Sequence, residues 1–195
     1  MKFDVIIIGG GLAAMAAGVF LLREGKRVAA VAEGLSLFKT DRAEFKSLGG
    51  VVLAGDSVVG YEMEGADISC IFTRNLGETP MRASAYILAT GKFFSRGLTA
   101  DMEGIRESVF GLDVDCDADR TLWCDDDFMA VQRFEKYGVI TDESSRTFKA
   151  GKVVGNLYAA GEIMSGVSGV GPGAEERIRE TARLAAENIL KRGEA

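Results

Sequence analysis

The chain has 195 residues, which suits one domain with a hydrophobic core, and we predict a single domain over residues 1–195. Its formal net charge of −6 argues against a basic face for nucleic acid or an anionic membrane. The absence of histidine excludes an imidazole base or metal ligand, and three cysteines without a C-x-x-C pair argue against a disulfide framework.

The chain begins with a predicted strand, a glycine-rich turn and a helix. Residues 5–8 are β-branched without interruption, as in a strand buried on both faces of a parallel sheet, and residues 13–24 show a helical pattern. The turn matches G-x-G-x-x-G/A, in which small residues allow a tight turn, close approach of a pyrophosphate and helix–sheet packing. The helix N-terminus attracts phosphate. We predict cofactor contacts here, with an ordinary glycine-rich turn as the alternative, at Gly9, Gly11, Leu12, Ala13 and Ala14.

Residues 27–32 form the predicted second strand, which completes a βαβ unit over residues 1–33. An acid at its end would accept hydrogen bonds from the adenosine ribose and repel a 2′-phosphate, which disfavours NADP. In most flavoproteins with this fingerprint the acid falls at the position of Ala32, so Glu33 stands one residue late. A shift of one residue turns a strand side chain to the opposite face of the sheet. Either the strand end is bulged or the ribose is held differently. The alternative interpretation is that Glu33 is an exposed residue at a strand end with no role in binding. The predicted ribose site is Ala32, Glu33 and Gly34.

A charged connection with a short helix near residues 42–48 leads to a segment, residues 49–89, that alternates in a β manner. We predict a β-meander there, with strands over residues 51–53, 57–62 and 68–74, before a buried strand over residues 86–89. In flavoproteins with two dinucleotide domains, a backbone group of such a segment contacts adenine, and Val58 is the candidate. The buried strand ends in small residues that let a dinucleotide lie across the sheet, or form a plain turn: Ala89, Thr90 and Gly91.

Four segments carry a resemblance to a known family. Residues 89–98 read Ala-Thr-Gly-Lys-Phe-Phe-Ser-Arg-Gly-Leu and residues 104–114 read Gly-Ile-Arg-Glu-Ser-Val-Phe-Gly-Leu-Asp-Val; residues 137–143 and 156–161 follow the same family. The sequence resembles the B subunit of anaerobic glycerol-3-phosphate dehydrogenase, a family of much longer proteins whose central region is absent here. The resemblance implies a flavin-binding subunit that passes electrons onward with a catalytic flavoprotein and an iron–sulfur subunit. FMN is the flavin attributed to the family, whereas the dinucleotide fingerprint favours FAD.

The predicted closing strand and helix occupy residues 155–192. In this superfamily such a strand ends in Gly-Asp or Gly-Glu, and the carboxylate accepts a hydrogen bond from the flavin ribityl chain; Gly161 and Glu162 match, with a plain strand-end acid as the alternative. A glycine-rich loop then enters the helix over residues 175–191, whose N-terminus would face the flavin. The loop candidates are Gly171, Gly173 and Ala174.

The remaining polar features carry weaker functional hypotheses. Residues 113–127 contain alternating aspartates but lack the glycine and final glutamate of a calcium loop, so we predict a solvated acidic loop and no metal. A partner-docking surface is the second interpretation of that loop. Arg96 and Arg106 have the chemistry to hold an anionic substrate, although surface salt bridges are the commoner use. No residue qualifies as an acid–base catalyst, so the catalytic residues are unknown.

The predicted fold is α/β: a Rossmann-like, doubly wound parallel sheet of the FAD/NAD(P)-binding class with a β-meander insert. The predicted function is that of an FAD-binding oxidoreductase or electron-transfer subunit; the alternatives are a flavin-binding module without turnover and an NAD-binding regulator. No segment reaches transmembrane length and no signal peptide is evident, so we expect a cytoplasmic protein, held at the inner membrane through partners if at all. The sequence is also compatible with a homo-oligomer.

Overall fold

The computed structural model describes residues 1–34, 39–127 and 129–193. Its centre is a six-stranded sheet in the order β11-β12-β6-β1-β2-β3. All neighbouring pairs run parallel except β11 with β12 at one edge. The strands are β1 (Lys2–Ile8), β2 (Val28–Ala32), β3 (Val51–Ala54), β6 (Arg82–Leu88), β11 (Arg146–Lys149) and β12 (Lys152–Ala159). The predicted α/β class with a parallel sheet is confirmed.

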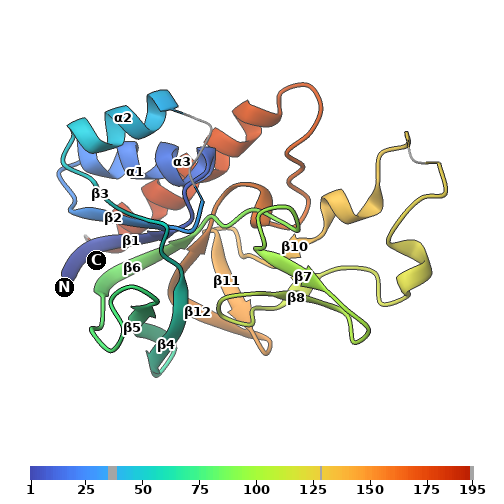
Figure 1. Cartoon of the computed structure of the whole chain (residues 1–195), viewed down its shortest axis with the longest axis horizontal. Coiled ribbons are helices and arrows are strands. Elements are labelled where there is room, and N and C mark those ends of the chain that lie inside the picture. The colour runs from blue at the N-terminus through green and yellow to red at the C-terminus, as the bar shows by residue number, and fades with distance from the viewer. Residues whose placement is uncertain (35–38, 128, 194–195) are drawn as a thin grey trace.

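One face of this sheet is covered by helices, as Figure 1 shows. They are α1 (Leu12–Arg23), α2 (Lys39–Ser47) and α3 (Ala174–Gly193). Side chains at alternate strand positions, Val5 and Ile7 among them, form one hydrophobic core with α1 and α3. Gly18 lets α1 pack closely against α2, because a Cβ there would lie 2.3 Å from a ring carbon of Phe45 in α2. The parallel strands therefore meet a closely packed helical layer.

The other face of the sheet is covered by antiparallel β-structure, which takes the place of a second layer of helices. Ile6 and Ile8 belong to a separate core with residues of β5, β7 and β10. The covering elements are β4 (Val58–Glu64), β5 (Asp67–Thr73), β7 (Leu98–Ala100), β8 (Ile105–Glu107), β9 (Val114–Asp115) and β10 (Gly138–Val139), with the 3₁₀ turns η1 (Arg120–Leu122), η2 (Arg133–Lys136) and η3 (Gly161–Ile163). Burial on both faces explains why residues 5–8 of β1 are apolar without alternation.

The predicted meander is divided in the structure. β3 pairs in parallel with β2 and extends the main sheet, whereas β4 and β5 form an antiparallel hairpin. An isolated antiparallel bridge from Ile71 to Met81 continues that hairpin toward β6. The antiparallel insert therefore starts at β4, because residues 51–54 find an open parallel edge beside β2.

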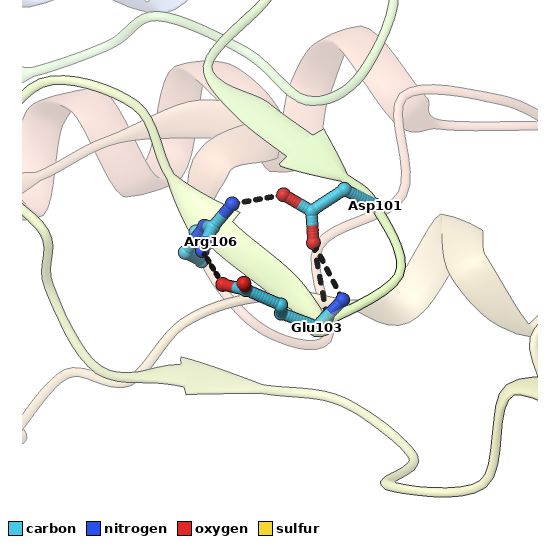
Figure 2. A network of polar contacts seen from close by, with 4 residues as sticks. Asp101, Glu103 and Arg106 are labelled. Atoms are coloured by element: carbon cyan, nitrogen blue, oxygen red, sulfur yellow. Dashed lines mark hydrogen bonds and ion pairs between the residues drawn. The ribbon is translucent and has the colours of Figure 1, made fainter.

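The β7–β8 hairpin engages Arg106 in ion pairs within its own turn. Asp101 Oδ1 accepts hydrogen bonds from the backbone N–H groups of Glu103, at 2.8 Å, and Gly104, at 3.2 Å. The Arg106 guanidinium pairs with Asp101 and, at 2.8 Å, with Glu103, as Figure 2 shows. Arg106 thus closes the turn through its ion pairs with Asp101 and Glu103.

No helix within residues 1–34, 39–127 and 129–193 is long and apolar enough to cross a membrane.

Candidate functional site

A groove of about 1170 Å³ runs across the carboxyl ends of β1, β2, β6 and β12. Parallel strands place their carboxyl ends at one edge of a sheet, and ligands of open α/β sheets bind in the crevice outside that edge. The volume exceeds the roughly 300–1,000 Å³ of sites for drug-sized ligands. The groove therefore has room for an extended dinucleotide.

The fingerprint turn forms one wall of the groove, and its glycines have different structural roles. Gly9 has φ +131°, and a Cβ there would lie 2.1 Å from the carbonyl oxygen of Ala89 at the end of β6. A Cβ on Gly10 would lie 2.7 Å from the Cβ of Ala32. A Cβ on Gly11 would meet no atom of the described residues within 4 Å, because this residue faces the groove. Gly9 and Gly10 are therefore needed for packing, whereas Gly11 is needed only by a ligand.

The N-terminus of α1 is open toward the same wall. Gly11 is the N-cap residue, no side chain among the described residues caps the helix, and its first turn contains no acid. The first N–H groups of a helix lack intrahelical acceptors and carry partial positive charge. Gly11 and Leu12 line the groove, so these donors are available to an anion.

The closing strand ends beside the fingerprint helix. Gly161 has φ +80°, and a Cβ there would lie 2.6 Å from the Cβ of Ala13. The Gly161 N–H donates to Thr181 Oγ1 of α3 at 2.9 Å. Glu162 lines the groove, and its carboxylate lies against Gly169, where a Cβ would be 2.2 Å from Oε1. The two glycine-bearing strand ends therefore meet at one groove.

A buried lysine lies behind Glu162. Lys92 is 8% exposed and donates to the Glu135 carbonyl oxygen of η2. Burial lowers the pKa of Lys92 to about 8, against an opposing effect of the nearby Glu162 and Glu135 carboxylates. Its charge balances part of the acidic lining at this end of the groove.

The opposite end of the groove is formed by segments far apart in the chain. Glu33 follows β2, and Arg74 follows β5; their side chains form an ion pair with a nitrogen–oxygen distance of 3.4 Å. Asp56 is 1% exposed and accepts hydrogen bonds through Oδ1 from the N–H groups of Ser57, at 2.9 Å, and Asn75, at 3.0 Å. Asp56 Oδ2 and Ser57 Oγ are buried without a hydrogen-bond partner in the described part of the chain.

Most of the cofactor contacts predicted from sequence line this groove: Gly9, Gly11, Leu12, Ala13, Glu33, Gly34, Val58, Ala89, Thr90, Gly91 and Glu162. Their assignment as cofactor contacts stays a prediction. Ala14, fully buried in α1, and Gly161, behind Glu162, are packing residues, and Ala32 packs against Gly10.

The predicted loop contacts Gly171, Gly173 and Ala174 lie outside the groove wall, whereas Gly169 and Glu175 line it. The loop folds back because the Arg177 guanidinium donates to the Pro172 carbonyl at 2.8 Å and to the Val170 carbonyl at 3.3 Å. A local glycine pattern does not reveal which side of such a loop faces a groove.

Sequence reasoning missed several groove residues, including Gly10, Asp56, Ser57, Arg74, Phe94 and Ser108. Gly10 was detectable as the middle glycine of a run of three. Arg96 also lines the groove, in a left-handed conformation with φ +62° that is uncommon outside glycine and asparagine. Phe94 lies in the turn between β6 and β7, and the others lie next to strands whose pairing brings them to the site.

The acidic loop of residues 113–127 directs its carboxylates to separate partners. Asp113 accepts hydrogen bonds from the Ala150 and Gly151 N–H groups at 2.8 and 2.7 Å. Asp117 accepts from Arg133 and Tyr137, and Asp119 caps η1. No group of three or more potential metal-ligating side chains occurs in the residues that the structure describes.

A family model described as FAD binding domain matches residues 4–39 and 34–176. The chain belongs to the FAD-binding domain family. The prediction of FAD as the cofactor is thereby confirmed. Solved structures support the fold: a thioredoxin reductase from Gloeobacter violaceus matches with a TM-score of 0.63 at 13% identity, covering 100% of this chain and 96% of that one. The GidA-related protein from Thermus thermophilus matches with a TM-score of 0.60 at 16% identity, covering 97% and 99%.

Curated relatives of this FAD-binding chain carry the name expected from its motifs. The B subunit of anaerobic glycerol-3-phosphate dehydrogenase from Actinobacillus pleuropneumoniae serotype 5b is 36% identical over 162 residues, 80% of this chain and 38% of the relative. The protein of that name from Pasteurella multocida is 37% identical over 162 residues, with 80% and 38% covered. The resemblance is confirmed, and the chain spans 38% of the length of these relatives.

Proposed function

We propose that the chain holds FAD in an extended pose along the groove and acts as a flavoprotein oxidoreductase or electron-transfer subunit. The observation that carries this proposal is the convergence of two strand ends on one groove. The fingerprint turn and Glu162 both line the groove, and Gly161 packs against Ala13 at the start of α1. A simple NAD-binding unit needs only the first of these elements.

The residues present fit such a cofactor. The pyrophosphate would lie over Gly9, Gly11 and Leu12, where glycine leaves the backbone open and the N–H groups of α1 are uncapped. Thr90 Oγ1 is buried without a hydrogen-bond partner in the described chain, and Glu162 offers an acceptor to the ribityl chain. When bound, FAD supplies the redox chemistry, and the protein supplies orientation and electrostatics.

The electrostatics of the flavin end come from groups on three elements. Glu162 and Glu175 line the groove, and Lys92 lies buried behind Glu162. Glu175 in the first turn of α3 suits the helix dipole but opposes negative charge on a flavin beside it. We expect the protonation state of Lys92 to influence the reduction potential at this end.

The substrate and the partners are proposed from the relatives' name and from the family resemblance of the motifs. The name and the resemblance support oxidation of glycerol 3-phosphate within an assembly that includes a catalytic flavoprotein and an iron–sulfur subunit. They also support peripheral association with the inner membrane through those partners. A flavin-binding module without turnover is the second candidate, and the specific observation in its favour is that the central region of the family is absent between the second strand and the predicted meander.

Two measurements test these proposals. The purified protein is denatured, and the released small molecule is identified by chromatography and absorbance; we expect FAD, whereas NAD or no nucleotide would refute the function. The intact protein is then mixed with glycerol 3-phosphate under anaerobic conditions, and an artificial electron acceptor is added afterwards. Bleaching of the flavin by glycerol 3-phosphate and recovery of its colour as the acceptor is reduced support turnover, whereas a flavin reduced only by dithionite supports the module without turnover.

A further inference from the structure

The adenosine end of the groove contains a cation and an anion that already face each other. Glu33 Oε1 lies 3.4 Å from Arg74 Nη2, and both residues line the groove. The pair joins residues 41 positions apart in the chain. Their side chains are 47% and 58% exposed, so the pair contributes little to folding and stays accessible to a ligand.

The position of Glu33 answers the question raised by its sequence register. β2 ends at Ala32, whose methyl group faces Gly10 and fills the place where the acid usually stands. Glu33 lies beyond the strand in a bend, so the alternation of a strand no longer dictates its direction. Its carboxylate therefore reaches the groove although Glu33 stands one residue later in the sequence than the usual acid.

The backbone on both sides of the Arg74 side chain is held firmly. The Arg74 N–H donates to the Ser57 carbonyl at 2.9 Å, and the next N–H, of Asn75, donates to Asp56 Oδ1 at 3.0 Å. Asp56 is 1% exposed and also accepts from Ser57. Arg74 is thus a cation on a rigid turn, aimed at a carboxylate on a freer bend.

We propose, on the basis of the proposed FAD site, that Arg74 is the residue that positions Glu33 for the adenosine ribose and that the pair sets nucleotide specificity. The carboxylate accepts the 2′- and 3′-hydroxyls while Arg74 holds its other side. A 2′-phosphate meets the negative charge of Glu33 first, and Arg74, which has the chemistry to bind that phosphate, is already neutralised. Specificity against 2′-phosphorylated nucleotides therefore depends on Glu33 masking Arg74.

The test uses the full chain stripped of flavin and a matched pair of probes, ADP-ribose and 2′-phospho-ADP-ribose, titrated by calorimetry alongside FAD. The variants are Glu33→Ala, Arg74→Ala and the double variant. Arg23→Ala is the control, because Arg23 forms an exposed ion pair with Glu44 that is similarly accessible and lies outside the groove. Thermal unfolding of each variant establishes that it is folded.

We expect the unmodified protein to favour ADP-ribose by about tenfold or more, because a carboxylate accepting ribose hydroxyls makes charge-assisted hydrogen bonds. Arg74→Ala should weaken FAD and ADP-ribose by about threefold to tenfold while keeping the discrimination. Glu33→Ala should weaken both by about tenfold and raise the affinity for 2′-phospho-ADP-ribose, a gain that the double variant loses.

Two results would overturn the inference alone: Arg74→Ala binding FAD and ADP-ribose like Arg23→Ala, or Glu33→Ala gaining no affinity for the 2′-phosphate. A folded, unmodified protein that binds neither FAD nor ADP-ribose would overturn the proposed function as well.

Discussion

Gly11→Val is the substitution that most directly separates folding from cofactor binding. The backbone of Gly11 has φ −79° and ψ −170°, which any residue adopts. Within the described part of the chain, a Cβ there would meet no atom within 4 Å, and the residue lines the groove. The valine side chain would therefore extend into the space where a pyrophosphate must contact the backbone.

The expected changes in free energy differ greatly between folding and binding. Replacing glycine at a compatible conformation stabilises a protein by about 0.4–1 kcal/mol, and the loss of glycine at an N-cap offsets a few tenths to about 1 kcal/mol of that. Stability should therefore change by less than about 1 kcal/mol. Loss of two phosphate hydrogen bonds, at about 1.5–3 kcal/mol each, weakens FAD by a factor of roughly a hundred or more.

The assay measures two quantities on one preparation: flavin bound per chain from absorbance, and the free energy of unfolding of the flavin-free protein in urea. Gly9→Ala is the contrasting variant, because φ +131° and a Cβ 2.1 Å from the Ala89 carbonyl oxygen should destabilise folding by at least about 2 kcal/mol. A Gly11→Val protein that retains normal flavin content would refute the placement of the pyrophosphate. A Gly11→Val protein that fails to fold would refute the open environment of this residue.

Three further predictions concern residues around the groove. Gly169→Ala places a Cβ 2.2 Å from the present position of Glu162 Oε1, so it should displace that carboxylate and weaken FAD by about threefold to tenfold in a fluorescence titration; unchanged affinity would exclude Glu162 as a contact. Gly18→Val meets Phe45 at 2.3 Å and should lower the urea unfolding free energy by about 1–3 kcal/mol, while the folded protein binds FAD normally, since Gly18 is outside the groove. Burial lowers the pKa of Lys92 from 10.5 to about 8, so between those values the unfolded chain binds more protons and stability rises with pH. The rise should be about 1–3 kcal/mol and absent from Lys92→Met, and equal urea pH profiles for the two proteins would contradict it.

Much of the site could be predicted because its signals are local. The apolar run of β1, the glycine spacing and the start of α1 follow one another within the first 23 residues, so strand, turn and helix N-terminus are dictated together. The second signal, Gly161 with Glu162, lies next to another buried strand. Parallel strands bring such ends to one edge, so the two motifs predict a shared groove without knowledge of the strand order.

Other parts of the site depend on contacts between segments that no spacing rule connects. The partner of Glu33 is Arg74, which reaches it only because β4 and β5 pair as a hairpin and place that turn over the end of β2. Lys92 has a lowered pKa because the folded chain buries it, with its ammonium group donating to the Glu135 carbonyl oxygen of η2. Nothing in its immediate sequence distinguishes it from an exposed lysine.

The sequence by itself determined the βαβ fingerprint, the α/β class, the meeting of two glycine-bearing strand ends at one sheet edge and the closing helix, because each follows from short-range periodicity and glycine spacing. Only the tertiary structure decided that β3 joins the parallel sheet, that Gly169 rather than Gly171 or Gly173 lines the groove, and that Arg74 faces Glu33. These facts depend on which edges and turns are left free once the sheet is assembled, and that geometry is set by pairing across long stretches of chain.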